Sequence, residues 1–179
     1  MSRTLGSATR VLLLADTHGF LDERIAALAR ACDVAVHAGD VGNSQVIETL
    51  EAAGARVFAV RGNNDVASKW PSDQRRAAQA LEAFARVELP GGVLIATHGD
   101  AYAPSSRHAR LRGAFSEARA IVYGHSHRLV VDDAQSPWVL NPGAAGRART
   151  YGGPSCLILE ASTKAWRVAP QRFERVSVR

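Results

Sequence analysis

The chain has 179 residues, of which 46% are hydrophobic and 22% charged, and its formal net charge is +5 at pH 7. This length suits a single domain over residues 1–179, and the composition excludes a disordered chain or a coiled coil. Cys32 and Cys156 lie far apart, which excludes a disulfide scaffold or a cysteine-built zinc site. The apolar run 11–15 is too short for a signal sequence or a membrane span, so we expect a cytoplasmic protein without membrane contact.

The positive charge is spread along the chain and does not form one basic segment. Lysine and arginine together number 22 against 17 acidic residues, and only 6% of the residues are aromatic. A nucleic-acid-binding face usually combines clustered basic residues with aromatic side chains that stack on bases. The pattern favours a solvated, arginine-rich surface. It makes nucleic acid an unfavoured partner without excluding it, and it leaves the oligomeric state open.

The first sixty residues alternate between apolar runs and helical periodicity. Short continuous apolar runs are typical of strands that are covered on both faces. Asp22 is a suitable N-cap for the first helix, and Asn43 or Ser44 for the second. We predict strands over 10–16, 33–39 and 55–60 and helices over 22–32 and 43–53. This β-α-β-α-β order implies a parallel layer with right-handed crossovers.

The remainder of the chain is more varied. Residues 67–76 contain Trp70, Pro71 and several basic residues, which predicts a loop or a lid. We expect helices over 77–84 and 105–117, strands over 86–89 and 93–97 joined by a turn at Pro90-Gly91-Gly92, and a buried strand over 120–123. The short apolar runs that follow are predicted to be antiparallel pieces of a second sheet: 129–132, 138–140, 155–160 and 166–169.

Polar residues follow five of the predicted strands at the point where each strand ends. Open α/β sheets place their sites beyond the carboxyl ends of strands, so these residues are expected to converge. In an extended backbone, alternate side chains point the same way, which predicts that Asp16 and His18 face one point, as do His125 and His127. The five segments are Asp16-Thr-His18, Gly39-Asp40, Gly62-Asn63-Asn64-Asp65, Thr97-His98-Gly99-Asp100 and Gly124-His125-Ser126-His127.

The residue types at these strand ends indicate metal ligands. Oxygen and imidazole nitrogen without thiolate suit Mn, Fe, Zn, Ni or Mg. Seven such groups are too many for one ion but suit two ions that share a bridging carboxylate. Glycines at 39, 62, 99 and 124 allow tight turns near the ions. A lone histidine is more often a satisfied polar group, and we interpret His37 and His108 in that way.

The ordered motifs DxH, GD, GNxD, HG and GHxH resemble those of calcineurin-like metallophosphoesterases. From Arg10 to about Arg167 the chain is similar to their short single-domain phosphodiesterase branch in bacteria and archaea. The resemblance implies an α/β fold, a four-layer α/β/β/α sandwich with mixed sheets and a dinuclear site at one edge. It implies that Asp16, His18 and His127 bind one ion, that Asn63, His98 and His125 bind the other, and that Asp40 bridges them. The ions would be two divalent cations, with Mn²⁺ preferred and Ni²⁺, Fe²⁺, Zn²⁺ or Mg²⁺ as alternatives.

Two positions depart from the family pattern. Many relatives have a histidine at the position of Asn64, where it assists the leaving group. An amide cannot act as an acid there, but it can donate a hydrogen bond to a phosphoryl oxygen, or it can merely shape the turn.

The segment Leu140-Asn-Pro-Gly143 resembles the family's NPG loop, with Ala144 in place of a frequent serine. We predict Asn64 as a catalytic residue and Arg61 with Asn64 as substrate contacts, and Arg147 or Arg149 as weaker candidates.

The resemblance implies hydrolysis of a phosphodiester by a metal-bridging hydroxide. The small phosphoester substrate would be one whose leaving group departs easily, since the motifs contain no obvious general acid. Three alternatives stay open. The chain could be a phosphomonoesterase or protein phosphatase, a nuclease, or a non-catalytic protein-binding scaffold like the metal-poor relative in the eukaryotic retromer coat.

Overall fold

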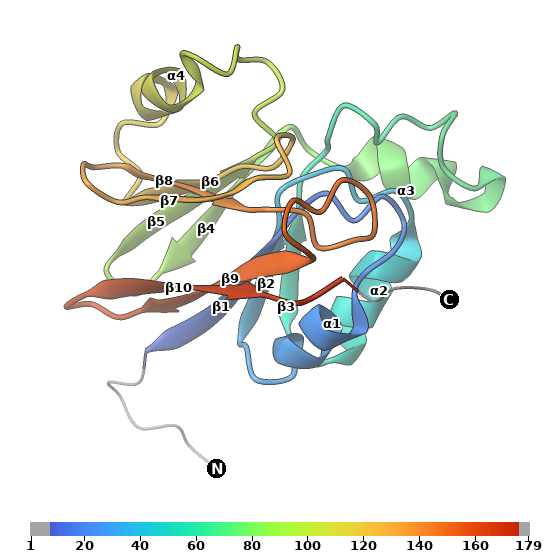
Figure 1. The fold of residues 1–179 in the computed structure, drawn as a ribbon, viewed down its shortest axis with the longest axis horizontal. Coiled ribbons are helices and arrows are strands. Elements are labelled where there is room, and N and C mark those ends of the chain that lie inside the picture. The colour runs from blue at the N-terminus through green and yellow to red at the C-terminus, as the bar shows by residue number, and fades with distance from the viewer. Residues whose placement is uncertain (1–7, 176–179) are drawn as a thin grey trace.

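A computed structural model describes residues 8–175, which form two facing β-sheets with helices on their outer faces (Figure 1). The first sheet has the strand order β10-β9-β1-β2-β3, and the second has the order β4-β5-β6-β8-β7. The strands of the first sheet are β1 (Thr9–Leu14), β2 (Val34–His37), β3 (Arg56–Ala59), β9 (Ser155–Ala161) and β10 (Trp166–Arg172). Those of the second are β4 (Phe84–Leu89), β5 (Gly92–Thr97), β6 (Ala120–Val122), β7 (Leu129–Asp132) and β8 (Trp138–Pro142).

The parallel layer predicted for the first sixty residues is confirmed. Strand β1 pairs in parallel with β2, and β2 pairs in parallel with β3. Helix α1 (Glu23–Ala29) and helix α2 (Ser44–Ala52) form the crossovers. The side chain of Asp22 accepts a hydrogen bond from the Arg24 amide, and the side chain of Asn43 accepts one from the Val46 amide. These bonds satisfy amides at the helix starts that would otherwise have no partner.

The prediction for the last four apolar runs is wrong in part. Strands β9 and β10 belong to the first sheet, where β9 is antiparallel to β1 and to β10. Strand β8 is in the second sheet as expected but is parallel to β6, and only β7 is antiparallel to β8. Local hydrophobicity carries no information about which distant strand becomes the partner, so these runs could not be assigned from their own residues.

The middle of the chain also differs from its prediction. Helix α3 (Arg75–Ala80) begins earlier than the predicted helix over 77–84 and ends before Phe84, which starts β4. A short 3₁₀ helix, η1 (Ser72–Gln74), precedes α3, and helix α4 (Arg107–Ala114) is shorter than predicted. The predicted turn between β4 and β5 is confirmed.

Three apolar clusters separate four layers. The largest fills the space between the sheets and includes Val11, Leu13 and Leu94. A second, with Leu12, Ile25 and Leu50, lies between the first sheet and helices α1 and α2, while a third packs α4 against the second sheet. The structure therefore confirms the α/β/β/α sandwich with mixed sheets (Figure 1). Within residues 8–175, no helix has the length and apolarity needed to cross a bilayer.

Candidate metal centre

The residues predicted as metal ligands lie together where strands of both sheets end. The loops after β1, β2 and β3 come from the first sheet, and the loops after β5 and β6 come from the second. Two groups of acidic and imidazole side chains have ligand atoms that all lie within 4.8 Å of one another. The first group is Asp16, His18 and His127, and the second is Asp16, Asp40 and His98.

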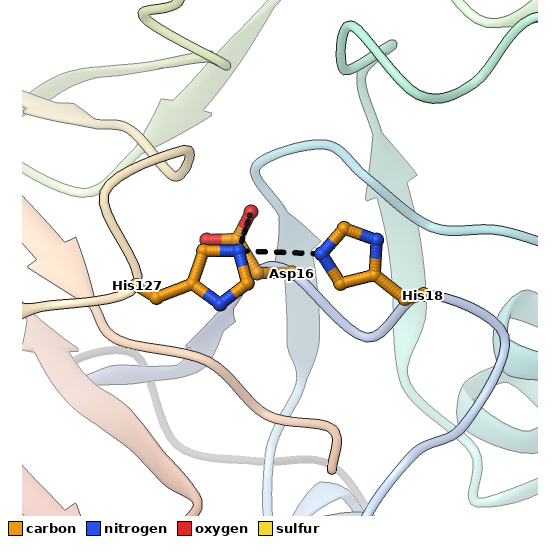
Figure 2. A group of neighbouring side chains, drawn as sticks. All are labelled: Asp16, His18 and His127. Atoms are coloured by element: carbon orange, nitrogen blue, oxygen red, sulfur yellow. Dashed lines mark hydrogen bonds and ion pairs between the residues drawn. The ribbon is translucent and has the colours of Figure 1, made fainter. Parts of the chain in front are cut away.

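Figure 2 shows the first group, in which two imidazoles and a carboxylate face one point. The Nε2 atoms of His18 and His127 are 3.2 Å apart, and their rings are stacked. The Nε2 atom of His127 is also 3.5 Å from Oδ1 of Asp16. Three lone-pair donors from the ends of two different sheets thus share a space that one divalent cation could occupy.

The second group shares Asp16 with the first, and its Asp40 also approaches His18 of the first. Oδ2 of Asp40 is 3.5 Å from Nε2 of His98 and 3.8 Å from Nε2 of His18, so this carboxylate lies between those two imidazoles. Oδ1 of Asn63 is 3.1 Å from Nε2 of His98 and 3.0 Å from Nδ1 of His125. All seven predicted ligands therefore belong to one continuous cluster.

Backbone carbonyl groups orient two of the imidazoles. Nδ1 of His98 is 2.9 Å from the carbonyl oxygen of Ala38, and Nδ1 of His127 is 3.0 Å from that of Ala148. A carbonyl oxygen can only accept, so each Nδ1 carries the hydrogen and donates it. In His127 this leaves the Nε2 lone pair directed into the cluster, the arrangement that metal-ligating histidines use, whereas Nε2 of His98 faces oxygens of Asp40 and Asn63 and would exchange its proton for a cation.

The backbone conformation of the predicted ligands differs from the extended one expected from the sequence. Five of the predicted ligands have φ between 48° and 65°, the left-handed region: Asp16, His18, Asp40, His125 and His127. The extended, alternating backbone expected for the DxH and GHxH segments is therefore wrong, although the side chains do converge. Each such residue costs on the order of 1–3 kcal/mol, and such conformations concentrate at functional sites.

Two glycines allow the strand ends to approach closely. At Gly39, where φ is +92°, a Cβ atom would lie 2.5 Å from Nδ1 of His98. At Gly62 a Cβ atom would overlap both the backbone and the carboxylate of Asp40. Any larger residue at these positions would push the second group apart.

The electrostatics of the cluster fit a cation. Oδ2 of Asp16 is buried and has no hydrogen-bond partner among the described residues. Burial, reinforced by the charge of Asp40, raises the pKa of Asp16 to about 7. Burial also acts to raise the pKa of Asp40, but hydrogen bonds from His98 and Asn64 outweigh it and hold that pKa below its usual value. A buried carboxylate oxygen without a donor is stabilised by a metal ion, so the residues present fit the divalent cations that the resemblance implies.

His37 and His108 lie outside the cluster, and the prediction that both are satisfied polar groups is confirmed for His108 but wrong in part for His37, whose buried Nδ1 has no hydrogen-bond partner among the described residues. Nδ1 of His108 is 2.7 Å from Oδ2 of Asp132, and its Nε2 is 3.0 Å from the Tyr123 hydroxyl, so both ring nitrogens have protein partners. The buried His37 has its Nε2 2.8 Å from Oγ1 of Thr17, and burial lowers the pKa of His37 to about 4. Thr17 in turn donates to the carbonyl of Val41, so His37 supports the DxH loop from behind.

Sequence reasoning missed Asp65 as a structural residue of the site. Its buried carboxylate accepts hydrogen bonds from the amides of Val41, Gly42 and Gly62 and from the indole of Trp70. It therefore ties the loop after β3 to the loop after β2. The motif signal was present, because Asp65 is the last residue of the GNxD segment, but the sequence alone does not show which amides it faces.

Asn141 of the NPG loop holds the GHxH segment. Its buried side chain donates to the carbonyl of Gly124 and to Oγ of Ser126, and its Oδ1 accepts from the amide of Gly143. The family's serine is replaced by Ala144, but Ser155 of β9 donates its hydroxyl to the carbonyl of Pro142 in the same loop. This loop therefore retains a side-chain hydrogen bond from elsewhere in the chain.

The two predicted substrate contacts have different surroundings. Asn64 is half-buried, and both its backbone amide and its Nδ2 donate to the carboxylate of Asp40 at 2.8 Å. This geometry supports the turn-shaping role of Asn64 and leaves a second Nδ2 hydrogen. Arg61 is exposed directly before Gly62, and its contact with a substrate stays a prediction.

The structure has two mixed sheets and, at the edge that they share, a cluster of side chains suited to two metal ions. This combination defines a class of α/β/β/α proteins with a candidate dinuclear centre. The chain belongs to the calcineurin-like phosphoesterase superfamily, because the sequence model of that domain matches residues 10–164. Proteins of this superfamily generally bind divalent metals, and they act on phosphoric esters as hydrolases.

Individual relatives agree with this assignment. A phosphodiesterase of Methanocaldococcus jannaschii is 25% identical over 166 residues, which cover 88% of this chain and 96% of the relative. The fold is similar to that of a Vps29 single mutant from Entamoeba histolytica, with a TM-score of 0.72 and 16% identity over 93% of this chain and 100% of that one. It is also similar to an archaeal phosphodiesterase, with a TM-score of 0.65 and 22% identity over 91% and 100% of the two chains.

Proposed function

We propose that this protein is a phosphodiesterase that uses two divalent cations, with Mn²⁺ as the preferred metal, to hydrolyse a small phosphoester. The observation that carries the proposal is the cluster itself. Seven competent groups converge, two imidazoles are oriented by backbone carbonyls, and the buried Oδ2 of Asp16 has no protein partner within the described residues.

Asp16, His18 and His127 would hold one cation, Asn63, His98 and His125 would hold the other, and Asp40 would contact both. When bound, the cations would neutralise charge on phosphoryl oxygens and lower the pKa of a nearby water. The chain's own contribution is to fix the ligands: Ala38 and Ala148 orient two imidazoles, and Asp65 and Asn141 tie the loops together.

Asn64 is proposed to contact the substrate phosphate beside Asp40. Its amide orientation is fixed because one Nδ2 hydrogen is donated to Oδ2 of Asp40, and the second hydrogen can be donated to a phosphoryl oxygen. Arg61 is proposed to approach the same phosphate from the exposed side of the loop.

The first test is turnover of bis(p-nitrophenyl) phosphate by the purified protein with added Mn²⁺, compared with chelator-treated protein. We expect diester hydrolysis that depends on the added metal and exceeds hydrolysis of p-nitrophenyl phosphate. Faster hydrolysis of the monoester would instead support the phosphomonoesterase alternative, and cleavage of single-stranded DNA or RNA would support a nuclease. Folded protein that neither binds Mn²⁺ nor turns over any ester would favour the non-catalytic scaffold.

The second test is the variant Asp40→Ala, with Asp73→Ala as the control. Metal catalysis contributes several kcal/mol, so loss of the shared carboxylate should lower kcat/KM by about 1000-fold or more. Mn²⁺ binding, measured by calorimetry, should weaken together with activity. Asp73 is an exposed carboxylate of η1 and its removal should change neither quantity. Full activity of Asp40→Ala would show that Asp40 is not a shared ligand.

A further inference from the structure

We propose that Lys69 donates the proton to the leaving group of the phosphoester; this inference rests on the proposed phosphodiesterase function. Nζ of Lys69 donates a hydrogen bond to Oδ1 of Asn64 at 2.6 Å. Asn64 in turn donates through Nδ2 to Oδ2 of Asp40 at 2.8 Å. An ammonium group therefore lies one side chain away from the carboxylate at the middle of the cluster.

The donor and the acceptor of each hydrogen bond between Lys69, Asn64 and Asp40 are fixed. An ammonium can only donate and an ionised carboxylate can only accept, so the amide of Asn64 must present its oxygen to Lys69 and its nitrogen to Asp40. Within residues 8–175, Lys69 forms no salt bridge with a carboxylate. Its positive charge is therefore not neutralised locally and is available to a departing oxygen.

The backbone at Lys69 is anchored although the side chain is exposed. The amide of Lys69 donates to the carbonyl of Val66 at 2.9 Å, which closes a turn. The next residue, Trp70, is buried, and its indole donates to Oδ1 of Asp65 at 3.1 Å. Since Asp65 also holds the loops after β2 and β3, Lys69 is presented to the cluster from a fixed position.

A substrate with a poor leaving group needs a proton donor, which the predicted metal ligands and Asn64 do not supply. The imidazoles of His98 and His127 direct Nε2 into the cluster, and an amide such as Asn64 has no acidic proton. Arginine stays protonated, whereas a lysine ammonium can give up a proton and regain it. Most of the 22 basic residues are arginines, and the chain has lysine only at positions 69 and 164.

In the proposed step, water forms a new bond to phosphorus while the bond between phosphorus and the leaving oxygen breaks. The electron pair of that bond stays on the leaving oxygen, which takes a proton from Nζ of Lys69 and departs as an alcohol. The proton released by the attacking water passes to solvent. The exposed amine of Lys69 regains a proton from solvent, so one ester and one water give one acid and one alcohol.

The test compares Lys69→Met, Lys69→Arg and the control Lys164→Met on two diesters that differ in leaving group. Bis(p-nitrophenyl) phosphate has a good leaving group, and diphenyl phosphate has a poor one. General-acid assistance is worth about 100-fold or more, so Lys69→Met should lose about 100-fold in kcat on the phenyl ester and about tenfold or less on the nitrophenyl ester. Lys164 lies in the β9–β10 turn, beside the start of β1 and therefore away from Asp16, and its variant should match the wild type.

Lys69→Arg retains the charge but cannot deliver the proton, so it should resemble Lys69→Met. Mn²⁺ affinity, measured by calorimetry, should be the same in all four proteins, since Lys69 contacts none of the proposed ligands. Equal losses on both esters, rescue by arginine or weakened Mn²⁺ binding would overturn the proton-donor role while the phosphodiesterase function stands. Wild-type protein without turnover on either ester would overturn the proposed function, and the role of Lys69 with it.

Discussion

Two polar clusters that contain histidine differ in how completely the protein satisfies their hydrogen-bonding atoms. At the edge shared by the sheets, Nδ1 of His98 and of His127 donates to a backbone carbonyl, and Nε2 of each ring faces other predicted metal ligands in a common space. On the outer face of the second sheet, His108 uses both ring nitrogens, one with Asp132 and one with Tyr123. Both clusters contain histidine and aspartate, but only at the shared edge do several of these side chains point their ligand atoms at one another.

The carboxylates of the two clusters show the same difference. Oδ2 of Asp132 is 2.8 Å from Nη2 of Arg112 as well as 2.7 Å from His108, so its charge is compensated by the protein. Oδ2 of Asp16 is buried without a partner, and Asp40 lies beside it. The structural cluster is thus complete without a ligand, whereas the candidate binding cluster keeps a buried carboxylate oxygen that has no protein partner within residues 8–175 and that a cation would stabilise.

The largest expected effect is that of Asp16→Asn on the response to metal. Wild-type protein should gain about 2.7 kcal/mol of unfolding free energy when Mn²⁺ is present at one hundred times its dissociation constant. The variant should lose most of this gain, because the buried carboxylate is gone. Without metal, the variant should be more stable than the wild type by about 1 kcal/mol, since a buried charge beside Asp40 has been removed. Urea unfolding with and without Mn²⁺ measures the stability gained from the metal and the stability of the metal-free proteins. A metal-free variant less stable than the metal-free wild type would contradict the proposed difference between the two clusters.

A smaller effect is expected for Asn141→Ala, which removes the hydrogen bonds to Gly124 and Ser126 but no proposed ligand. Groups that orient metal ligands typically contribute 10- to 100-fold in affinity, so Mn²⁺ should bind roughly 10- to 100-fold more weakly. Ser162→Ala is the matched control, because it removes a turn hydrogen bond to Ala165 in the β9–β10 turn. Calorimetric titration of Mn²⁺ checks the prediction, and wild-type affinity in Asn141→Ala would show that the GHxH loop is held by other contacts.

The smallest effect is that of Asp132→Asn on stability. Burial acts to raise the pKa of Asp132, but hydrogen bonds from Arg112 and His108 outweigh it and lower that pKa. A carboxyl whose folded pKa is depressed stabilises the protein above its unfolded pKa, near 4, and this contribution is lost as the pH falls through the folded value. The variant should therefore be about 1 kcal/mol less stable at neutral pH, with the difference narrowing below about pH 4. Chemical unfolding across pH checks this, and a difference that widens in acid would contradict the sign.

Much of the fold could be predicted because the apolar runs are local signals. Strands β2 and β3 fall within predicted runs, β1 does so except for its first residue, Thr9, and the helices between them begin at predicted caps. The sheet to which β9 belongs could not be predicted, because its partner β1 lies at the other end of the chain, where Val11 faces Leu159. The choice between partners is made by the whole packed sandwich and not by the seven residues of β9.

The candidate site also has features that could be predicted from the sequence and features that could not. The order of the motifs brought all seven predicted ligands to one edge, since the ends of strands are topologically fixed. The left-handed backbone at Asp16 and His127 could not be predicted, because non-glycine residues adopt it only when the surrounding structure imposes it. The contact between Lys69 and Asn64 was missed for a related reason: it depends on the path of the loop around the buried Trp70.

Each group of clustered ligands takes side chains from both sheets: Asp16 and His18 follow β1, while His127 follows β6. A cation held there would act as a crosslink between the two halves of the sandwich. Such a crosslink can form only after the sheets have docked. The chain must therefore bring both sheets together before it can bind the metal. Metal-free molecules should accordingly keep their strands but open more readily between the layers at this edge, which slower amide exchange after loading would reveal.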